Sequence, residues 1–243
     1  MKDLFFVPSF GNKPRNLVGR EDILSIFEDC LDAAPGSRER TMLLLGQRGM
    51  GKTVLLLELA DMAKKKDFIV ASPTVVSKDM PERILEKLYV EGEKNIKPKK
   101  GRVTGGSISV LGFGAGIQLS DTTEQKKSFS RRLSECCNAF NRNGHPVLIL
   151  IDEVQADTAE LKQLIVAYQE MIGEGNDVVL VMAGLPNAVS AVLNDHVLTF
   201  LNRAVKTHLL PLNIRDIENY YINAFSELGI KIEEKMTKDA AAC

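Results

Sequence analysis

Long apolar runs are missing from this chain of 243 residues. None approaches the ~18 residues that a membrane-spanning helix requires, and residues 1–8 are too short and too interrupted to form a signal peptide. An excess of charge is missing as well, because the formal net charge is −1. These absences exclude a membrane protein and a surface that is basic overall. Nucleic-acid binding would therefore need a local patch or another domain.

Cysteines at metal-ligand spacing are also missing. The four cysteines are Cys30, Cys136, Cys137 and Cys243. The adjacent pair falls within an expected helix, where packing as small apolar side chains is favoured over a disulfide. Without a metal cluster or a disulfide framework, these cysteines fit a reducing compartment, and we expect a cytoplasmic protein.

The most informative stretch is residues 46–53, which match the pattern G-x-x-x-x-G-K-[ST]. An apolar run at 42–45 precedes it as an expected strand, and a helical pattern at 54–63 follows it. In this context glycines let successive backbone N–H groups turn toward a phosphate, and the helix N-terminus adds free donors. The predicted nucleotide-binding residues are Gly46, Gln47, Arg48, Gly49, Met50, Gly51, Lys52, Thr53 and Val54. We predict that the chain binds a nucleoside triphosphate, with Lys52 at the terminal phosphates and Thr53 on Mg²⁺.

An acidic pair follows the strongest buried-strand signal, the apolar run at 147–151. Asp152 can hold Mg²⁺ directly or through water, and Glu153 can polarise the attacking water as a catalytic base. The alternative is an Asp-Glu pair that only caps a strand-to-helix loop. A guanine-reading [NT]-K-x-D motif is absent, since residues 237–239 have the wrong order, so ATP or ADP is the expected nucleotide.

Strands alternate with helices along the chain. We expect strands at 42–45, 68–71, 147–151, 178–183 and 206–210, and helices at 22–31, 54–63, 81–93, 123–141, 158–172 and 214–228. This alternation predicts an α/β fold of three layers with a central, mainly parallel sheet. Apolar residues that alternate around glycines at 103–120 predict an inserted β-hairpin. Before it lies a basic cluster, which either contacts nucleic-acid phosphates or is simply solvated: Lys94, Lys97, Lys99, Lys100 and Arg102.

Several motifs occur in an order that is typical of one superfamily. They are Leu17-Val18-Gly19-Arg20-Glu21, the phosphate loop, Leu150-Ile151-Asp152-Glu153, Gly184-Leu185-Pro186-Asn187, and Arg203 before His208-Leu209-Leu210-Pro211-Leu212. Over about residues 14–230 the chain resembles AAA+ ATPases. More narrowly, it is similar to the branch that contains origin-recognition initiators, archaeal-type ATPases and STAND signalling NTPases. The resemblance implies a P-loop NTPase domain with Walker A and Walker B motifs that uses ATP and Mg²⁺.

Further roles come from the resemblance alone. It implies that Leu17 and Val18 line the adenine pocket, and that Asn187 is the sensor 1 residue between Glu153 and the γ-phosphate. It also implies that Arg203 is an arginine finger that acts in trans on a neighbouring subunit of a homo-oligomer. The open alternatives are that Asn187 caps a helix and that Arg203 pairs with a local carboxylate.

The expected domains are an N-terminal arm at 1–16, an ATPase domain at 17–211 and an incomplete helical lid at 212–243. We expect the chain to end inside that lid, where no arginine after Arg215 can serve as the sensor 2 residue of the family. The expected function is Mg-dependent ATP hydrolysis by a nucleotide-controlled switch, with DNA or a protein as its partner. The alternative is a nucleotide-gated binding module or a STAND-type signalling scaffold with little intrinsic hydrolysis.

Overall fold

The fold is seen in a computed structural model. The model describes residues 17–95, 128–155, 158–194 and 198–230, together with His196 and residues 236, 237 and 240. The expected arm (1–16), the expected hairpin (103–120) and the basic-cluster residues from 97 to 102 lie outside the described residues, as does most of the chain after residue 230.

A parallel sheet forms the centre of the molecule. Its five strands follow the order β2-β3-β4-β1-β5, and every paired strand runs parallel to its neighbour. The strands are β1 (Thr41–Leu45), β2 (Ile69–Val75), β3 (Val147–Val154), β4 (Val178–Gly184) and β5 (Val205–His208). Both β1 and β4 are buried along their whole length, as expected for strands covered on both faces. The predicted α/β class with a parallel sheet is confirmed.

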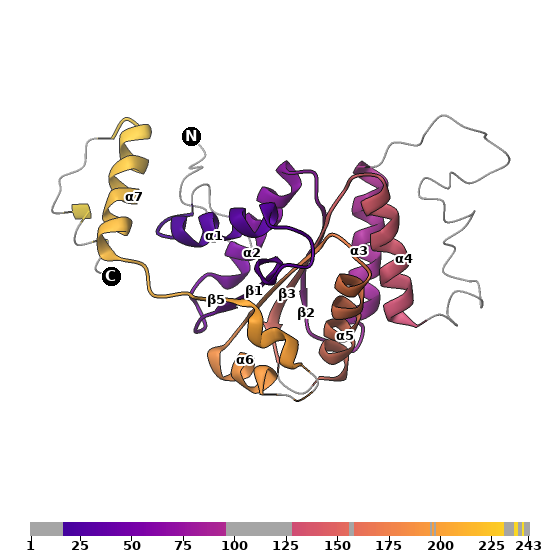
Figure 1. The fold of residues 1–243 in the computed structure, drawn as a ribbon. Coiled ribbons are helices and arrows are strands. Elements are labelled where there is room, and N and C mark those ends of the chain that lie inside the picture. Colours follow the sequence, from indigo (N-terminus) through magenta and orange to yellow (C-terminus); the bar gives the residue numbers. More distant parts are fainter. Residues whose placement is uncertain are drawn as a thin grey trace.

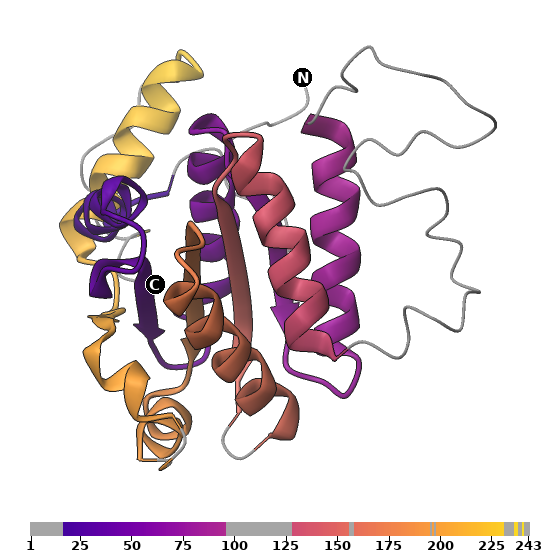
Figure 2. The same cartoon turned by 45° about the vertical axis from the view of Figure 1, so that its right-hand side comes forward.

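Helices cover both faces of the sheet and give the predicted three layers (Figures 1 and 2). The helices are α1 (Glu21–Asp32), α2 (Lys52–Lys65), α3 (Met80–Asn95), α4 (Phe129–Arg142), α5 (Ala159–Gly173), α6 (Pro186–Leu193) and, apart from the sheet, α7 (Ile214–Glu227), with 3-10 helices at Arg38–Arg40 and Thr199–Arg203. Leu44 and Leu150 pack with α1 and α2 in one core, whereas Leu43 and Ile149 pack with α3, α4 and α5 in the other. Neighbouring strand residues thus face opposite layers. Within the described part of the chain, no helix has the length and apolar character needed to cross a membrane.

Two strands extend beyond their predicted ends. β2 continues to Val75 and β3 continues to Val154, and each contains a register shift in its pairing. In β3 the shift falls between Ile151 and Val154, where the strand pairs with β4. An irregularity of this kind depends on the partner strand, so the apolar pattern of β3 alone does not reveal it. As a result, Asp152 and Glu153 lie within the strand and not after it.

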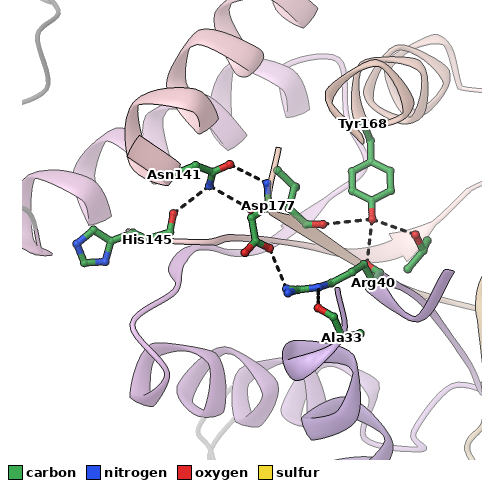
Figure 3. A network of polar contacts seen from close by, with 8 residues as sticks. Ala33, Arg40, Asn141, His145, Tyr168 and Asp177 are labelled. Carbon is green, nitrogen blue, oxygen red and sulfur yellow. Dashed lines mark hydrogen bonds and ion pairs between the residues drawn. The ribbon is translucent and has the colours of Figure 1, made fainter. Parts of the chain in front are cut away.

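A polar network ties together the amino ends of the strands (Figure 3). Arg40 is buried, its Nε donates to the Ala33 carbonyl at 2.7 Å, and its Nη1 lies 3.0 Å from Oδ1 of Asp177. The Tyr168 hydroxyl lies 3.0 Å from Thr41 Oγ1 and donates to the Arg40 carbonyl at 2.9 Å. These contacts join α1, β1, α5 and the residue before β4. The opposite edge of the sheet, at the carboxyl ends of the strands, carries the phosphate loop.

The last described helix, α7, stands beside α1 and away from the sheet (Figure 1). Its start approaches the loop before α1 closely. Gly19 has a φ of +64°, and a Cβ there would lie 3.1 Å from Asp216 Oδ2 and 3.2 Å from Leu212 Cδ2. A side chain at Gly19 would therefore be disfavoured by both conformation and space. The loop before α1 and the start of α7 therefore pack against each other at Gly19.

Candidate functional site

The loop between β1 and α2 carries the glycine motif. The Gly46 N–H donates to the Gly184 carbonyl at 3.2 Å, and the Leu55 N–H donates to the Gly51 carbonyl at 2.9 Å in the first turn of α2. Gly49 and Gly51 have φ values of +82° and +79°. Residues with side chains rarely adopt this left-handed conformation, so the loop path depends on these glycines.

Lys52 is the first residue of α2, and its side chain folds back over the loop. Its Nζ donates to the Gly46 carbonyl at 2.7 Å and to the Gln47 carbonyl at 2.8 Å. The ammonium group is therefore held next to the loop by backbone oxygens. A phosphate bound by the loop would lie within reach of this charge.

Thr53 and Asp152 meet although they are far apart in sequence. Thr53 Oγ1 donates to Asp152 Oδ2 at 2.6 Å, and Asp152 Oδ1 accepts from the Glu153 N–H at 2.9 Å. Asp152 is only 4% exposed. A hydroxyl and a carboxylate are hard oxygen ligands of the kind that Mg²⁺ prefers. Among the described residues no group of at least three His, Cys, Asp or Glu side chains could hold a metal ion.

Glu153 has an unusual backbone conformation. Its φ is +52°, it lies in the register shift of β3, and its side chain is exposed. A residue with a side chain pays a conformational penalty in this region, and such strain often marks functional sites. The shift turns Glu153 outward while its neighbour Asp152 stays buried against Thr53.

A cavity of about 650 Å³ adjoins the phosphate loop. Its size is typical of small-molecule sites. The cavity is lined by Leu17, Val18, Arg20, Gly49, Met50, Gly51, Val54, Leu55, Pro211, Leu212, Ile217, Tyr220 and Tyr221. The structure thus brings the predicted residues Leu17 and Val18 to the predicted loop residues. A smaller cavity of about 320 Å³ shares Leu17, Val18 and Tyr220 with it.

Several cavity residues were not predicted as site residues, although Arg20 belongs to the motif at 17–21. The Arg20 Nη2 donates to the Met50 carbonyl of the phosphate loop at 3.3 Å, and burial lowers the pKa of Arg20, with the nearby Glu21 carboxylate opposing the shift. Tyr220 and Tyr221 reach the cavity from α7. In the sequence, the position of Arg20 directly after Gly19 could have indicated a site role for it. The adjacent tyrosines in the amphipathic pattern at 214–228 could have done the same for α7.

Asn187 and Arg203 are not part of this cavity. Asn187 is the second residue of α6 and is exposed, and the N-cap of that helix is Leu185, so Asn187 does not occupy the capping position. Arg203 ends the 3-10 helix Thr199–Arg203 and is exposed, with no ion pair to any carboxylate in the described part of the chain. Their predicted roles stay predictions.

The fold and the loop between β1 and α2 define a P-loop NTPase. A family model described as "AAA ATPase domain" matches residues 16–181, and the chain belongs to this family. The resemblance to AAA+ ATPases stated from the motifs is thereby confirmed. A comparison with curated proteins finds no match.

Solved structures with the same fold include a Cdc6p, an ORC2 protein and a Walker-type ATPase. Cdc6p from Pyrobaculum aerophilum is 17% identical, with a TM-score of 0.61 over 99% of this chain and 58% of that chain. The ORC2 protein of Aeropyrum pernix in ADPNP-ADP complexes is 15% identical, with a TM-score of 0.62 over 99% and 59%. The Walker-type ATPase PABY2304 of Pyrococcus abyssi is 15% identical, with a TM-score of 0.66 over 98% and 66%. This chain thus spans about three fifths to two thirds of the length of these proteins.

Proposed function

We propose that this chain binds ATP with Mg²⁺, hydrolyses it, and acts as a nucleotide-controlled switch. The observation that carries the proposal is the 2.6 Å hydrogen bond between Thr53 Oγ1 and Asp152 Oδ2. It joins the start of α2 to the acidic pair of β3, and the nearby residues Gly51 and Val54 line a cavity that suits a nucleotide in size. The membership in the AAA ATPase domain family supports the same function.

Phosphate binding falls to the loop and to α2. The backbone N–H groups after Gly46 and the N-terminus of α2 would face the phosphates, and Lys52 would move from the carbonyls of Gly46 and Gln47 to phosphate oxygens. Both carbonyl contacts are hydrogen bonds of an ammonium group to neutral acceptors. Exchange for anionic oxygens is therefore electrostatically favourable.

Hydrolysis falls to the acidic pair. Thr53 and Asp152 would hold Mg²⁺, which neutralises charge on the β- and γ-phosphates when bound. Glu153, turned outward by its left-handed backbone, would orient and polarise the attacking water. Asp152, the buried carboxylate, would thus bind the metal, and Glu153, the exposed carboxylate, would act on the water.

Base recognition falls to the mostly apolar part of the cavity. Leu17, Val18 and Val54 offer apolar walls for adenine, while Tyr220 and Tyr221 of α7 offer aromatic faces. Because this cavity has one wall on the phosphate loop and another on α7, nucleotide binding would fix the position of α7 relative to the sheet. We propose this coupling as the basis of the switch.

Two further residues complete the proposed machinery. Asn187 stands at the start of α6, directly after the carboxyl end of β4, and would approach the γ-phosphate as sensor 1. Arg203 is exposed and would complete the site of a second copy of this chain in trans. Mixing Arg203→Ala protein with Lys52→Ala protein should restore turnover at the mixed interface if Arg203 acts in trans.

The proposal is tested by the variant Glu153→Gln. It should bind ATP as tightly as the wild type but lose turnover by about a hundredfold or more, because the amide cannot accept a proton. Turnover equal to that of the wild type would overturn the assignment of Glu153. Tight nucleotide binding with negligible wild-type turnover, measured with and without DNA, would instead favour the nucleotide-gated binding module.

A further inference from the structure

Gly184 occupies the point where the parts of the candidate site meet. It is the last residue of β4, and it pairs with Leu45 of β1 on one side and with Val154 of β3 on the other. Leu45 is the residue before the phosphate loop, and Val154 is the residue after the acidic pair. The carbonyl of Gly184 also accepts the 3.2 Å hydrogen bond from the Gly46 N–H.

The pairing with Val154 defines the end of the register shift in β3. Regular pairing with β4 stops at Ile151 and resumes where Val154 meets Gly184, so Asp152 and Glu153 lie between these two fixed points. The left-handed φ of Glu153 belongs to the same irregularity. The acidic pair is therefore bounded by the pairing of Ile151 on one side and the pairing of Val154 on the other.

Gly184 leaves little room for a side chain. A Cβ there would lie 3.0 Å from Val154 Cβ, 3.0 Å from Val189 Cγ2 and 3.4 Å from the Val154 carbonyl oxygen. Gly184 does not have a left-handed φ, so these contacts, and not the backbone conformation, disfavour a methyl group. Val189 belongs to α6, the helix that carries Asn187 near its start.

We propose that Gly184 is a positioning residue, whose missing side chain lets β3 and α6 close on β4 so that Glu153 and Asn187 are held in place. A methyl group would push Val154 and Val189 outward by a few tenths of an ångström. The acidic pair moves with Val154, and the start of α6 moves with Val189. The phosphate loop keeps its backbone hydrogen bond to the Gly184 carbonyl, because the substitution does not change that group.

This inference rests on the proposed function, and the test is Gly184→Ala. We expect ATP affinity without Mg²⁺ to stay within about threefold of the wild type, while kcat falls by about tenfold or more, since small displacements of catalytic groups have large effects on rate. The gain in ATP affinity that Mg²⁺ provides should shrink as well, because Asp152 lies inside the displaced segment. This Mg²⁺-dependent gain in ATP affinity can be measured even when turnover is slow.

Gly173→Ala is the matched control. Gly173 ends α5, has no left-handed φ, and a Cβ there would meet no heavy atom within 4 Å. This variant should match the wild type in kcat and in the Mg²⁺ effect. A second-site change, Val189→Ala, removes the Cγ2 atom that a methyl at position 184 would meet, so the Gly184→Ala/Val189→Ala protein should recover part of the lost kcat.

The outcomes are separable. A wild type that does not bind ATP overturns the proposed function, whereas a wild type that binds ATP while Gly184→Ala shows the same kcat and the same Mg²⁺ effect overturns only this inference. A loss of thermal stability in Gly184→Ala with unchanged kcat per folded molecule also overturns it. If Gly184→Ala does not fold, Gly184→Ala/Val189→Ala measured against Val189→Ala gives the same comparison.

Discussion

Thr53 Oγ1 and Asp152 Oδ2 lie 2.6 Å apart, although 99 positions separate these residues in the sequence. Thr53 is the second residue of α2, the helix after the phosphate loop, and Asp152 lies in the register shift of β3. Their contact brings a hydroxyl and a buried carboxylate to one place, and Val54, which follows Thr53, lines the nucleotide-sized cavity. The account of metal binding depends on this pair.

Removal of either partner should uncouple Mg²⁺ from ATP binding. Thr53→Ala and Asp152→Asn should each reduce the Mg²⁺-dependent gain in ATP affinity by about 10–100-fold, because each removes an oxygen that holds or orients the metal. Titration of ATP with and without Mg²⁺ by calorimetry measures this gain. Thr53→Ser keeps the hydroxyl and is the control. A full Mg²⁺ effect in Asp152→Asn would contradict the assignment.

The left-handed backbone of Glu153 predicts a stability difference. With φ at +52°, glycine should be more stable than alanine at this position by about 1 kcal/mol, because alanine keeps the steric penalty and glycine does not. Urea unfolding of Glu153→Gly and Glu153→Ala measures the difference, and both variants lack the carboxylate. Equal unfolding free energies would mean that the residue is not strained in solution.

Much of this arrangement could be predicted from the sequence. The runs at 42–45 and 147–151 are buried strands because parallel strands covered on both faces need continuous apolar residues. The glycine motif predicted the loop, since its chemistry depends on local backbone conformation. Together, the strand pattern and the glycine motif place three site residues at one edge of the sheet: Lys52, Thr53 and Asp152.

Other features depend on tertiary packing that a single strand or helix does not encode. The register shift that includes Glu153 exists only in the pairing of β3 with β4. The space for a side chain at Gly184 is restricted by Val154 and Val189, which come from separate elements. Tyr220 lies in the cavity because α7 returns to the loop before α1, a tertiary contact that the helical pattern of α7 does not specify.

Arg20 should contribute to nucleotide affinity through the phosphate loop. Arg20→Ala removes the Nη2 hydrogen bond to the Met50 carbonyl and a wall of the cavity. We expect ATP affinity to fall by about three- to tenfold, the range for a partly exposed hydrogen bond from a charged group. Arg38→Ala is the control, because the Arg38 side chain is 73% exposed and does not line the cavity. Equal affinity in both variants would contradict this role.

The Tyr168 hydroxyl should stabilise the fold without affecting the site. Tyr168→Phe leaves the buried Thr41 hydroxyl and the Arg40 carbonyl without that partner (Figure 3). The unfolding free energy should fall by about 1–3 kcal/mol, the cost of leaving buried polar groups without their hydrogen bond. ATP affinity should not change, because the network lies at the opposite edge of the sheet. A stability change below about 0.5 kcal/mol would show that water satisfies these groups equally well.

The buried thiols predict a loss of stability at alkaline pH. Burial raises the pKa of Cys30 and of Cys137 to about 12, and it raises the pKa of Cys136 well above the ordinary value of 9.0. The native thiols thus keep their protons while the unfolded thiols ionise. Their contribution to stability is complete below pH 9.0 and declines as pH rises from there toward the folded pKa. Urea unfolding across this range should show the decline, and Cys137→Ala should make it shallower. An unchanged slope would contradict the assignment.

The most direct test of the central claim is equilibrium binding of ATP, with Mg²⁺, to the wild type and to Lys52→Ala. The wild type should bind ATP, and the variant should bind it at least about tenfold more weakly, because it lacks the ammonium group that reaches the phosphates. Circular dichroism of both proteins controls for folding. Absence of binding by the wild type, or equal binding by a folded Lys52→Ala protein, would contradict the claim that the loop at 46–53 is a nucleotide site.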